Sequence, residues 1–298
     1  HFILNNYIVT CCSTADMSKD FFESNNIPYV CFHFSIDEKE YMDDLGQSIP
    51  FNDFYQKMAD GALTSTSQVN VAEYEAFFEP YLKEGLDIIH ITLSSGLSGA
   101  YNSAIVASLH LKERYPDRKI SIVDSLGASS GYGLLVTYAH NNLESGMSFE
   151  NNVSWLVDNR LHIHHWFYST DLTWYYRGGR ISKTSALFGS ALHICPVLDM
   201  NCEGKLIPRS KCRGKKRAIE ALLKIMDEHV KDGSDYSGKC YISHSVCDDD
   251  VNILTAAIKE KFPKLDGDVV VNSIGTVIGS HTGPGTVALF FVGDKRVL

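Results

Sequence analysis

The sequence predicts an α/β protein of two domains, and three observations lead to that fold class. Its length of 298 residues suits two domains of roughly 150 residues each better than one ordinary core. The first half alternates short apolar strands with amphipathic helices, an order that builds a mainly parallel sheet between two layers of helices. In the second half the strands follow one another more closely, and a polar turn at residues 201–204 joins two of them, which favours an α+β domain.

The first half has the clearer alternation of strands and helices. Residues 86–93 (LDIIHITL) are rich in isoleucine and leucine and predict a strongly buried strand. The apolar residues of FNDFYQKMA, at residues 51–59, recur at helical spacing. Pro80 is expected to kink or shorten the helix that contains it. The predicted strands are residues 7–11, 27–34, 86–93 and 119–124, and the predicted helices are 18–25 with Ser18 as N-cap, 51–59, 71–83, 98–115 and 129–143.

The second half mixes hairpins with helices. A helix over residues 149–160 leads into it, and we expect the domain boundary there: an N-terminal three-layer α/β/α domain at 1–160 and a C-terminal α+β domain at 161–298. The predicted strands are residues 163–168, 193–200, 205–211, 239–244, 268–274 and 286–292, and the predicted helices are 215–230 and 249–262.

Composition and charge narrow the classes of function. The chain is 44% hydrophobic and 21% charged, which is typical of a globular protein. The formal net charge of −9 argues against a general nucleic-acid-binding surface, which needs clustered lysine and arginine. One basic run, RSKCRGKKR at residues 209–217, is either a solvated strand end and helix start or a surface for an acidic partner.

The cysteines and the lengths of the apolar runs indicate in which cellular compartment the protein is found. The eight cysteines form no CxxC pair, so zinc ribbons and thioredoxin-type chemistry have no support. Buried, reduced thiols are the expected state, and they fit a reducing cytosol. We expect no signal segment, and no apolar run reaches the ~18–20 residues needed to span a membrane. The sequence therefore predicts a cytoplasmic protein with at most transient membrane contact.

Five polar segments are placed where a ligand could bind. SSGLSG at residues 94–99 and SLGASS at 125–130 follow predicted parallel strands, and ligands of open parallel sheets bind beyond the carboxyl ends of the strands. Both offer backbone N–H groups to an anion at a helix start, although serine and glycine also commonly cap helices. Neither segment has the GxGxxG spacing or the Walker lysine of a nucleotide-binding loop, so neither predicts a nucleotide site. The other segments are TSTSQ at 64–68, RGGRIS at 177–182 and GSHTGPG at 279–285, which we expect to be a rigid loop around His281.

Six short motifs, in order along nearly the whole chain, resemble those of a known family. They are STAD at 13–16, TSQ at 66–68, SSGLSGAYNSA at 94–104, DS at 124–125 with GYGLLV at 131–136, GGRIS at 178–182, and IGSHTGPG at 278–285. In these motifs the chain resembles the DegV family of bacterial fatty-acid-binding proteins, the FakB type.

The resemblance implies a function and a set of site residues. A long-chain fatty acid of roughly C14–C18, such as palmitate, would lie in a pocket between or adjoining the domains, with no other cofactor, no metal and no catalysis by this chain. A separate ATP-using fatty acid kinase subunit would convert the bound acid to an acyl-phosphate for phospholipid synthesis. The residues implied at the carboxylate are Thr66, Ser98 or Ser95, His281 and Arg180, and the weaker candidates are Ser67, Gly99, Ser129 and Thr282.

Two positions depart from the family pattern. Cys12 stands where the family usually has a carboxylate, so a contact at that corner is expected to be lost. Val69 and Asn70 stand where Pro-Ser is common after the TSQ motif. Neither change removes a residue implied at the carboxylate.

A serine-dependent esterase or acyl hydrolase is the main alternative. Ser98, His281 and Asp124 could form a catalytic triad at a strand-to-helix turn. The segment GLSG is, however, one residue short of the GxSxG nucleophile elbow.

Two further alternatives remain. The segment HIHH offers His162, His164 and His165 as metal ligands. In a strand, His165 would point away from the other two, and no carboxylate or cysteine is close in the sequence. An interaction module that binds no lipid is the other alternative.

Overall fold

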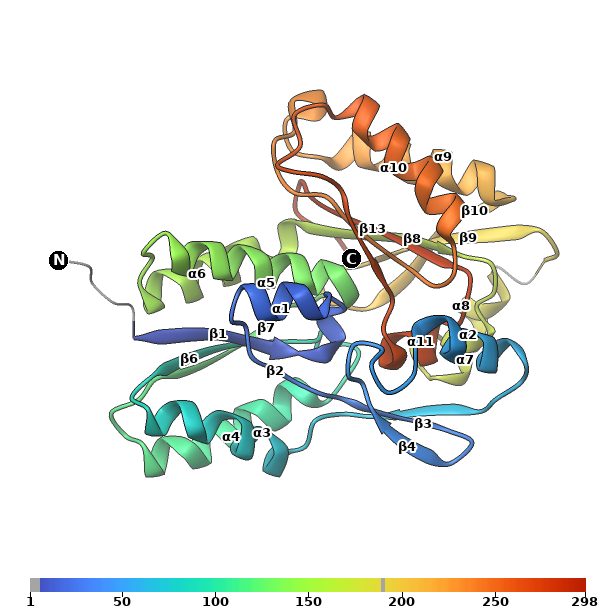
Figure 1. Cartoon of the computed structure of the whole chain (residues 1–298). Helices are drawn as coiled ribbons and strands as arrows, with labels where there is room; N and C mark the ends of the chain where they lie inside the picture. The colour runs from blue at the N-terminus through green and yellow to red at the C-terminus, as the bar shows by residue number, and fades with distance from the viewer. Residues whose placement is uncertain (1–5, 189–190) are drawn as a thin grey trace.

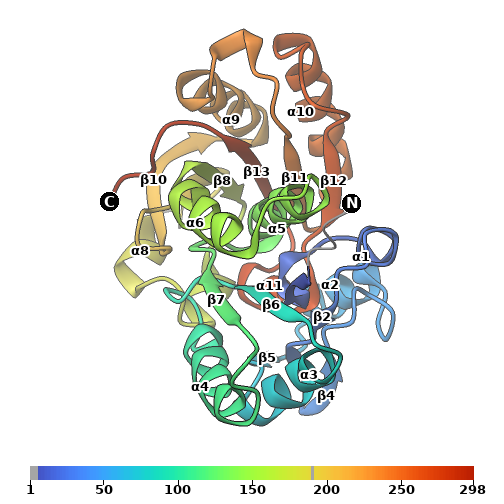
Figure 2. The same cartoon turned by 90° about the vertical axis from the view of Figure 1, so that its left-hand side faces the viewer.

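The computed structural model describes residues 6–188 and 191–298 as a two-domain α/β fold built in layers. Figures 1 and 2 show the order of the layers: a pair of helices, a parallel sheet, a second pair of helices, a mixed sheet and a third pair of helices. The predicted fold class, an N-terminal α/β/α domain and a C-terminal α+β domain, is confirmed. The boundary near residue 160 stays a prediction.

The sheet of the N-terminal domain is four-stranded and wholly parallel. Its elements are β1 (Tyr7–Cys12), β2 (Tyr29–Val30), β6 (Asp87–Thr92), β7 (Ile120–Asp124), α3 (Val71–Lys83), α4 (Ala100–Arg114), α5 (Ser129–Glu144) and α6 (Phe149–Asn159). The strand order is β2-β1-β6-β7, with α3 and α4 on one face and α5 and α6 on the other. Ile88, Ile89 and Ile91 of β6 are fully buried, because helices cover both faces of a parallel sheet.

Helix α5 joins the two domains because it lies between their sheets. It has no aspartate, glutamate, lysine or arginine before Glu144, and eleven of its residues are buried. If Gly131 carried a side chain, its Cβ atom would lie 2.3 Å from His165 Nε2 of the second sheet, which is too close. On the other side of the helix, a Cβ at Gly133 would lie 2.6 Å from Met17 Sδ. The two glycines therefore allow one helix to pack closely against both domains.

The sheet of the C-terminal domain is six-stranded and mixed. Its elements are β8 (Ile163–Ser169), β9 (Ile194–Met200), β10 (Leu206–Arg213), β11 (Tyr241–His244), β12 (Val270–Ser273), β13 (Thr286–Val292), α9 (Lys215–His229) and α10 (Asp248–Lys261). The order is β10-β9-β8-β13-β11-β12, and β9 and β10 form the predicted hairpin. Helices α9 and α10 cover the outer face over a core that includes Val197, Leu222, Leu254 and Phe291. The inner face belongs to a larger core that continues into the N-terminal domain.

A small antiparallel sheet, ordered β4-β3-β5, was not predicted from the sequence. Its strands are β3 (His33–Ile36), β4 (Lys39–Met42) and β5 (Thr64–Ser67). The predicted strand over residues 27–34 is in fact two strands, because the chain leaves the parallel sheet after β2 and enters this sheet at β3. The first four residues of the TSTSQ segment form β5, a strand that the sequence did not predict, and Thr66 pairs with Phe34. The run of hydroxyl side chains in β5 hides the alternation that normally identifies a strand.

Helix α11 (Thr276–Thr282) is a second difference. His281 lies in the last turn of this helix and not in a loop, and Gly283, with φ of +68°, ends the helix. Glycine and β-branched residues within TVIGSHT obscure the helical pattern. Pro80 does not shorten α3, which spans the whole predicted range.

The remaining helices are short. They are α1 (Lys19–Ser24), α2 (Phe51–Ala59), α7 (Thr173–Arg177) and α8 (Lys183–Phe188), with 3-10 turns at η1 (Ser13–Ala15), η2 (Arg160–His162) and η3 (Gly233–Asp235). Ser18 caps α1 as predicted, since its side chain accepts the Phe21 N–H at 3.0 Å. The other predicted elements agree with the structure to within two residues at each end. Within the described ranges, no helix combines the length and the apolar character needed to cross a bilayer.

Candidate ligand-binding site

A cavity of about 570 Å³ lies between the inner face of the six-stranded sheet, helix α11 and the SSGLSG loop. Small-molecule pockets commonly have volumes of about 300–1,000 Å³. Most of the wall is apolar, because inward-facing residues of four strands and the linker before β3 reach it. These include Phe32, Phe167, Met200, Leu206, Ala288 and Phe290. The cavity can therefore enclose an apolar ligand of considerable length.

The nine residues that the sequence analysis selected all lie in the wall of this one cavity. They come from β5, the SSGLSG loop, the start of α5, the segment after α7, and α11. Their part in ligand binding stays a prediction. The nine are Thr66, Ser67, Ser95, Ser98, Gly99, Ser129, Arg180, His281 and Thr282.

A hydrogen bond between Thr66 and His281 crosses the cavity wall. The Thr66 Oγ1 to His281 Nε2 distance is 2.8 Å, although the residues are 215 positions apart. Burial and the neighbouring Arg180 lower the pKa of His281 to about 4, so the imidazole is neutral at pH 7. Nδ1 has no hydrogen-bond partner among the residues that the structure describes. A buried unpaired acceptor is more tolerable than a buried unpaired N–H, so the proton belongs on Nε2. With its proton on Nε2, His281 donates to Thr66 and leaves the Thr66 hydroxyl hydrogen free for a ligand.

Arg180 supplies a positive charge beside this pair. Its Nε donates to the Leu97 carbonyl at 3.2 Å, and burial lowers the pKa of its half-buried guanidinium. In the part of the chain that the structure describes, no acidic side chain forms an ion pair with it. A partly buried cation without a counter-ion favours an anionic ligand, because pairing offsets the desolvation of both charges.

The SSGLSG loop brings further hydroxyl donors to the same place. Ser98 Oγ accepts the Ala100 N–H at 3.1 Å, so its own hydrogen is free to point into the cavity. Gly99 packs closely against Gln68, since a Cβ atom added at Gly99 would lie 2.6 Å from Gln68 Oε1. The backbone N–H of Ser95 donates to Asp124 Oδ1 at 3.2 Å, which fixes the loop and leaves the exposed Ser95 side chain at the surface end of the cavity wall.

The three weaker candidates that have a hydroxyl group all use it in another hydrogen bond. Ser129 donates to Asp16 Oδ2 at 2.6 Å. Ser67 follows Thr66 on its strand, so its side chain points to the opposite face, where His33 Nδ1 lies 3.2 Å away. Thr282 donates to the Gly283 carbonyl at 3.3 Å, a long bond.

The family of the chain follows from a comparison with known proteins. The family model described as "Uncharacterised protein, DegV family" matches residues 8–294. The chain belongs to the DegV family. The resemblance inferred from the motifs is thus confirmed over almost the whole chain.

Similar proteins share the full length of this DegV protein. A DegV domain-containing protein of Clostridium perfringens is 37% identical over 293 residues, which are 98% of this chain and 99% of that one. A structure described as fatty acid binding of a DegV family protein from Thermus thermophilus has 27% identity and a TM-score of 0.86, covering 97% of this chain and 100% of that chain. A stearic acid-binding protein from Eubacterium ventriosum has 26% identity and a TM-score of 0.85, covering 96% and 98%.

A buried acid that the sequence analysis missed, Asp43, holds the start of α11 in place. Asp43 accepts the hydroxyls of Thr276 and Ser13, each at 2.7 Å. Burial raises the pKa of Asp43, and burial together with repulsion from Asp43 raises that of Asp16 well above its usual range. Asp43 directly follows β4 and is next to Asp44 in an ordinary polar stretch, so no pattern in the sequence marks it. Its position at the start of α11 helps to orient the helix that carries His281.

A neutral thiol occupies the corner where the family usually has a carboxylate. Cys12 Sγ lies 3.1 Å from the Tyr74 hydroxyl and 3.5 Å from His90 Nε2. Burial raises the pKa of Cys12 to about 12, so this thiol is protonated at pH 7. The substitution therefore places an uncharged, hydrogen-bonded group in a fully buried position.

The triad of the hydrolase alternative does not form. Among the described residues, His281 bonds to Thr66, whereas Asp124 Oδ1 accepts the N–H groups of Ser95 and Leu126 at 3.2 and 2.9 Å. Since no acid among the described residues orients His281 toward Ser98, the Ser-His-Asp hydrogen-bond arrangement of a serine hydrolase is missing.

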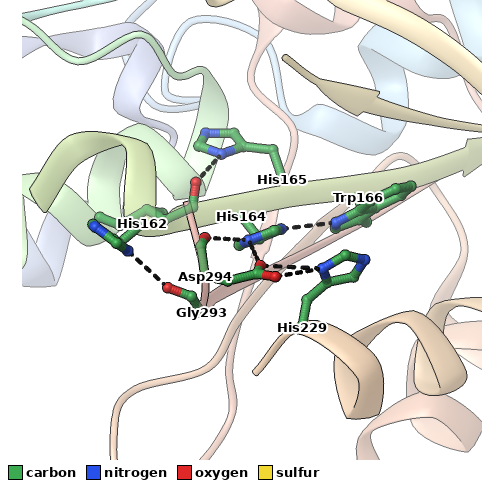
Figure 3. Close-up of polar contacts among 8 residues, drawn as sticks. His162, His164, His165, Trp166, His229, Gly293 and Asp294 are labelled. Atoms are coloured by element: carbon green, nitrogen blue, oxygen red, sulfur yellow. Dashed lines mark hydrogen bonds and ion pairs between the residues drawn. The ribbon is translucent and has the colours of Figure 1, made fainter. Parts of the chain in front are cut away.

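The histidines of the HIHH segment point in different directions (Figure 3). His162 Nδ1 donates to the Gly293 carbonyl at 2.9 Å, and His165 Nε2 accepts the Ala128 N–H at 3.2 Å on the other side of the strand. His164 instead meets His229 and Asp294, with ligand-type atoms within 4.8 Å of one another. Sequence reasoning placed no carboxylate near this segment, because Asp294 comes from the far end of the chain.

The Trp166 indole argues against a metal at this cluster. Its Nε1–H donates to His164 Nδ1 at 3.0 Å, so neutral His164 carries its proton on Nε2. That Nε2 donates to Asp294, at 2.7 Å from the carbonyl and 2.9 Å from Oδ1. Burial lowers the pKa of His164 to about 4. A metal at Nε2 would require an imidazole with no proton on either nitrogen, so hydrogen bonding is the better account of the cluster.

Gly178→Ala tests the packing that fixes His281. A Cβ at Gly178 would lie 2.1 Å from His281 Nδ1, so the ring must move off its bond with Thr66. We expect the free energy of unfolding to fall by about 1–3 kcal/mol, as in other overpacked sites, measured by urea denaturation.

The control is the same change in a His281→Ala background. There the clashing ring is absent, and Gly178→Ala should alter the free energy of unfolding by no more than about 0.5 kcal/mol. An equal loss in both backgrounds would show that the contact between Gly178 and His281 is not the cause.

Proposed function

We propose that this DegV protein binds a long-chain fatty acid, with the acyl tail in the apolar cavity and the carboxylate at Thr66, Ser98, His281 and Arg180. One observation carries the proposal. Hydroxyl and imidazole groups gather beside an arginine that has no acidic partner among the described residues, and they do so in the wall of an otherwise apolar cavity. A molecule with one acid group and a long apolar tail satisfies both parts of this wall.

The relatives support this choice of ligand. The Thermus thermophilus structure is described as fatty acid binding, and the Eubacterium ventriosum protein as stearic acid-binding. Both match nearly the whole of this chain at TM-scores of 0.86 and 0.85.

The tail and the head group have different energetic roles. Each buried CH₂ contributes about 0.8 kcal/mol, so a sixteen-carbon tail gains on the order of 12 kcal/mol before the costs of binding. Micromolar to nanomolar affinity remains after those costs. The tail gives little orientation, however. Orientation comes from the carboxylate, which is expensive to bury unless it accepts hydrogen bonds.

We further propose that the chain is a carrier that presents the acid to a separate, ATP-using fatty acid kinase subunit. Ser95 and Gly99 of the carboxylate wall are exposed, and Ser98 and Arg180 are half-buried, so a partner can reach the head group. Neutral hydroxyl donors leave the carboxylate oxygen able to attack a phosphoryl group. A cytoplasmic location follows from this proposal, because the kinase uses ATP.

Thr66→Val removes one hydroxyl while keeping the shape of the side chain. A hydrogen bond to a charged group contributes about 1.5–3 kcal/mol, so the dissociation constant for palmitate should rise about 10- to 150-fold. Titration calorimetry on delipidated protein measures the change.

Ser65→Ala is the matched control, since Ser65 lies on the same strand with its exposed side chain on the opposite face. We expect wild-type affinity from this variant. Equal affinities for the Thr66→Val and Ser65→Ala proteins would contradict the proposed head-group site.

The carrier role predicts that acyl-phosphate forms only in the presence of a kinase subunit. The protein loaded with palmitate is incubated with ATP, with and without a bacterial fatty acid kinase, and hydroxylamine traps any acyl-phosphate as a hydroxamate. Hydroxamate should appear only in the complete mixture. Product formed by this chain and ATP alone would make the chain an enzyme, and no product in the complete mixture would reject the presenting role.

A further inference from the structure

Cys195 and Cys212 face each other across the β9–β10 hairpin, on the outer side of the six-stranded sheet. The two residues are directly opposed in the strand register, so their side chains share one face, and both pack against the core beneath α9. The Gly214 N–H donates to the His193 carbonyl at 2.9 Å, two positions further along the ladder. Hydrogen-bonded pairs alternate along an antiparallel ladder, so Cys195 and Cys212 form such a pair.

This geometry is close to that of a disulfide. The Cα atoms of a hydrogen-bonded pair are about 5.5 Å apart, and about 5.5–6 Å is the commonest Cα separation across disulfides. The Cβ atoms of opposed residues are about 4.5–5.5 Å apart, whereas a disulfide needs about 3.5–4.5 Å. A shift of about 1 Å therefore brings the sulfurs into bonding range. A bond closed under such strain is more easily reduced than a relaxed one.

The two thiols differ in access. Cys212 is half-buried, whereas Cys195 is 4% exposed. Burial raises the pKa of both thiols, while Arg217 acts on Cys212 and Lys215 on Cys195 to favour the thiolate. A dissolved oxidant therefore reaches Cys212 first, and Cys195 is placed to resolve the adduct.

We propose that Cys195 and Cys212 are a reversible redox modification site, which a small disulfide such as glutathione disulfide oxidises to an intramolecular disulfide. The Cys212 thiolate attacks one sulfur of the oxidant, forms a mixed disulfide and releases one thiolate. The Cys195 thiolate then attacks the Cys212 sulfur and releases the second. The protein pair loses two electrons, the oxidant gains them, and the two protein thiol protons end on the two released thiols.

The new bond would fix the open end of a hairpin whose other end supplies Met200 and Leu206 to the cavity wall. It would close a loop over residues 195–212 and so remove conformational freedom from the unfolded chain. The oxidised protein should therefore have a thermal midpoint a few degrees above that of the reduced protein. This site does not depend on which ligand fills the cavity.

Peptide mapping of the folded, full-length protein after treatment with glutathione disulfide tests the proposal. Mass spectrometry without reduction should find a peptide linking Cys195 to Cys212, which dithiothreitol separates. In the Cys195→Ser variant the reaction should stop at a glutathione adduct on Cys212. The thermal midpoint of this variant should not rise on oxidation. Cys202→Ser, at the half-buried cysteine in the turn of the same hairpin, should behave as the wild type, because Cys202 is not opposed to either thiol.

Three results would overturn the proposal. One is a wild-type protein that carries only glutathione adducts, and another is a protein that stays unmodified. The third is a link from either cysteine to Cys247, whose thiol lies in the same core but is engaged with the Ser245 carbonyl at 3.3 Å.

Discussion

The hydrogen bond between Thr66 and His281 is the interaction on which the account of the cavity depends. It connects the edge strand β5 to helix α11, and so closes the wall between two distant parts of the chain. Burial keeps the imidazole neutral. In the proposed binding mode its Nε2–H donates to the Thr66 hydroxyl, which in turn donates to the carboxylate of the ligand. Gly178 sets the position of the ring from one side, and Asp43 fixes the start of its helix. The rest of the site is arranged around this pair.

The layered fold explains why the cavity lies at the junction of the domains. Helix α5 is buried between the two sheets, and its amino-terminal end reaches the cavity at Ala128 and Ser129. The inner face of the six-stranded sheet then supplies the apolar wall, while strand β5, loops and helices supply the polar groups. A ligand held there contacts both domains at once, so we expect its binding to stabilise their relative position.

The sequence predicted the strands and helices with regular apolar periodicity, and it failed where local chemistry conceals the period. The strand β5 is built from hydroxyl residues, and α11 contains glycine and a histidine, so neither shows a hydrophobic repeat. Thr66 and His281 could still be selected, because short motifs mark them. Phe167 and Phe290 could not, since only the strand order brings them to one face. Asp43 follows the end of β4, and its burial depends on contacts with distant residues such as Thr276 of α11.

A crystal structure of the protein with an ω-brominated long-chain fatty acid tests the central claim most directly, because anomalous scattering locates the tail and electron density locates the acid group. The account predicts bromine enclosed by the apolar wall and a carboxylate oxygen within about 3 Å of Thr66 Oγ1. A carboxylate remote from Thr66 and His281, or a bromine signal outside the cavity, would contradict it.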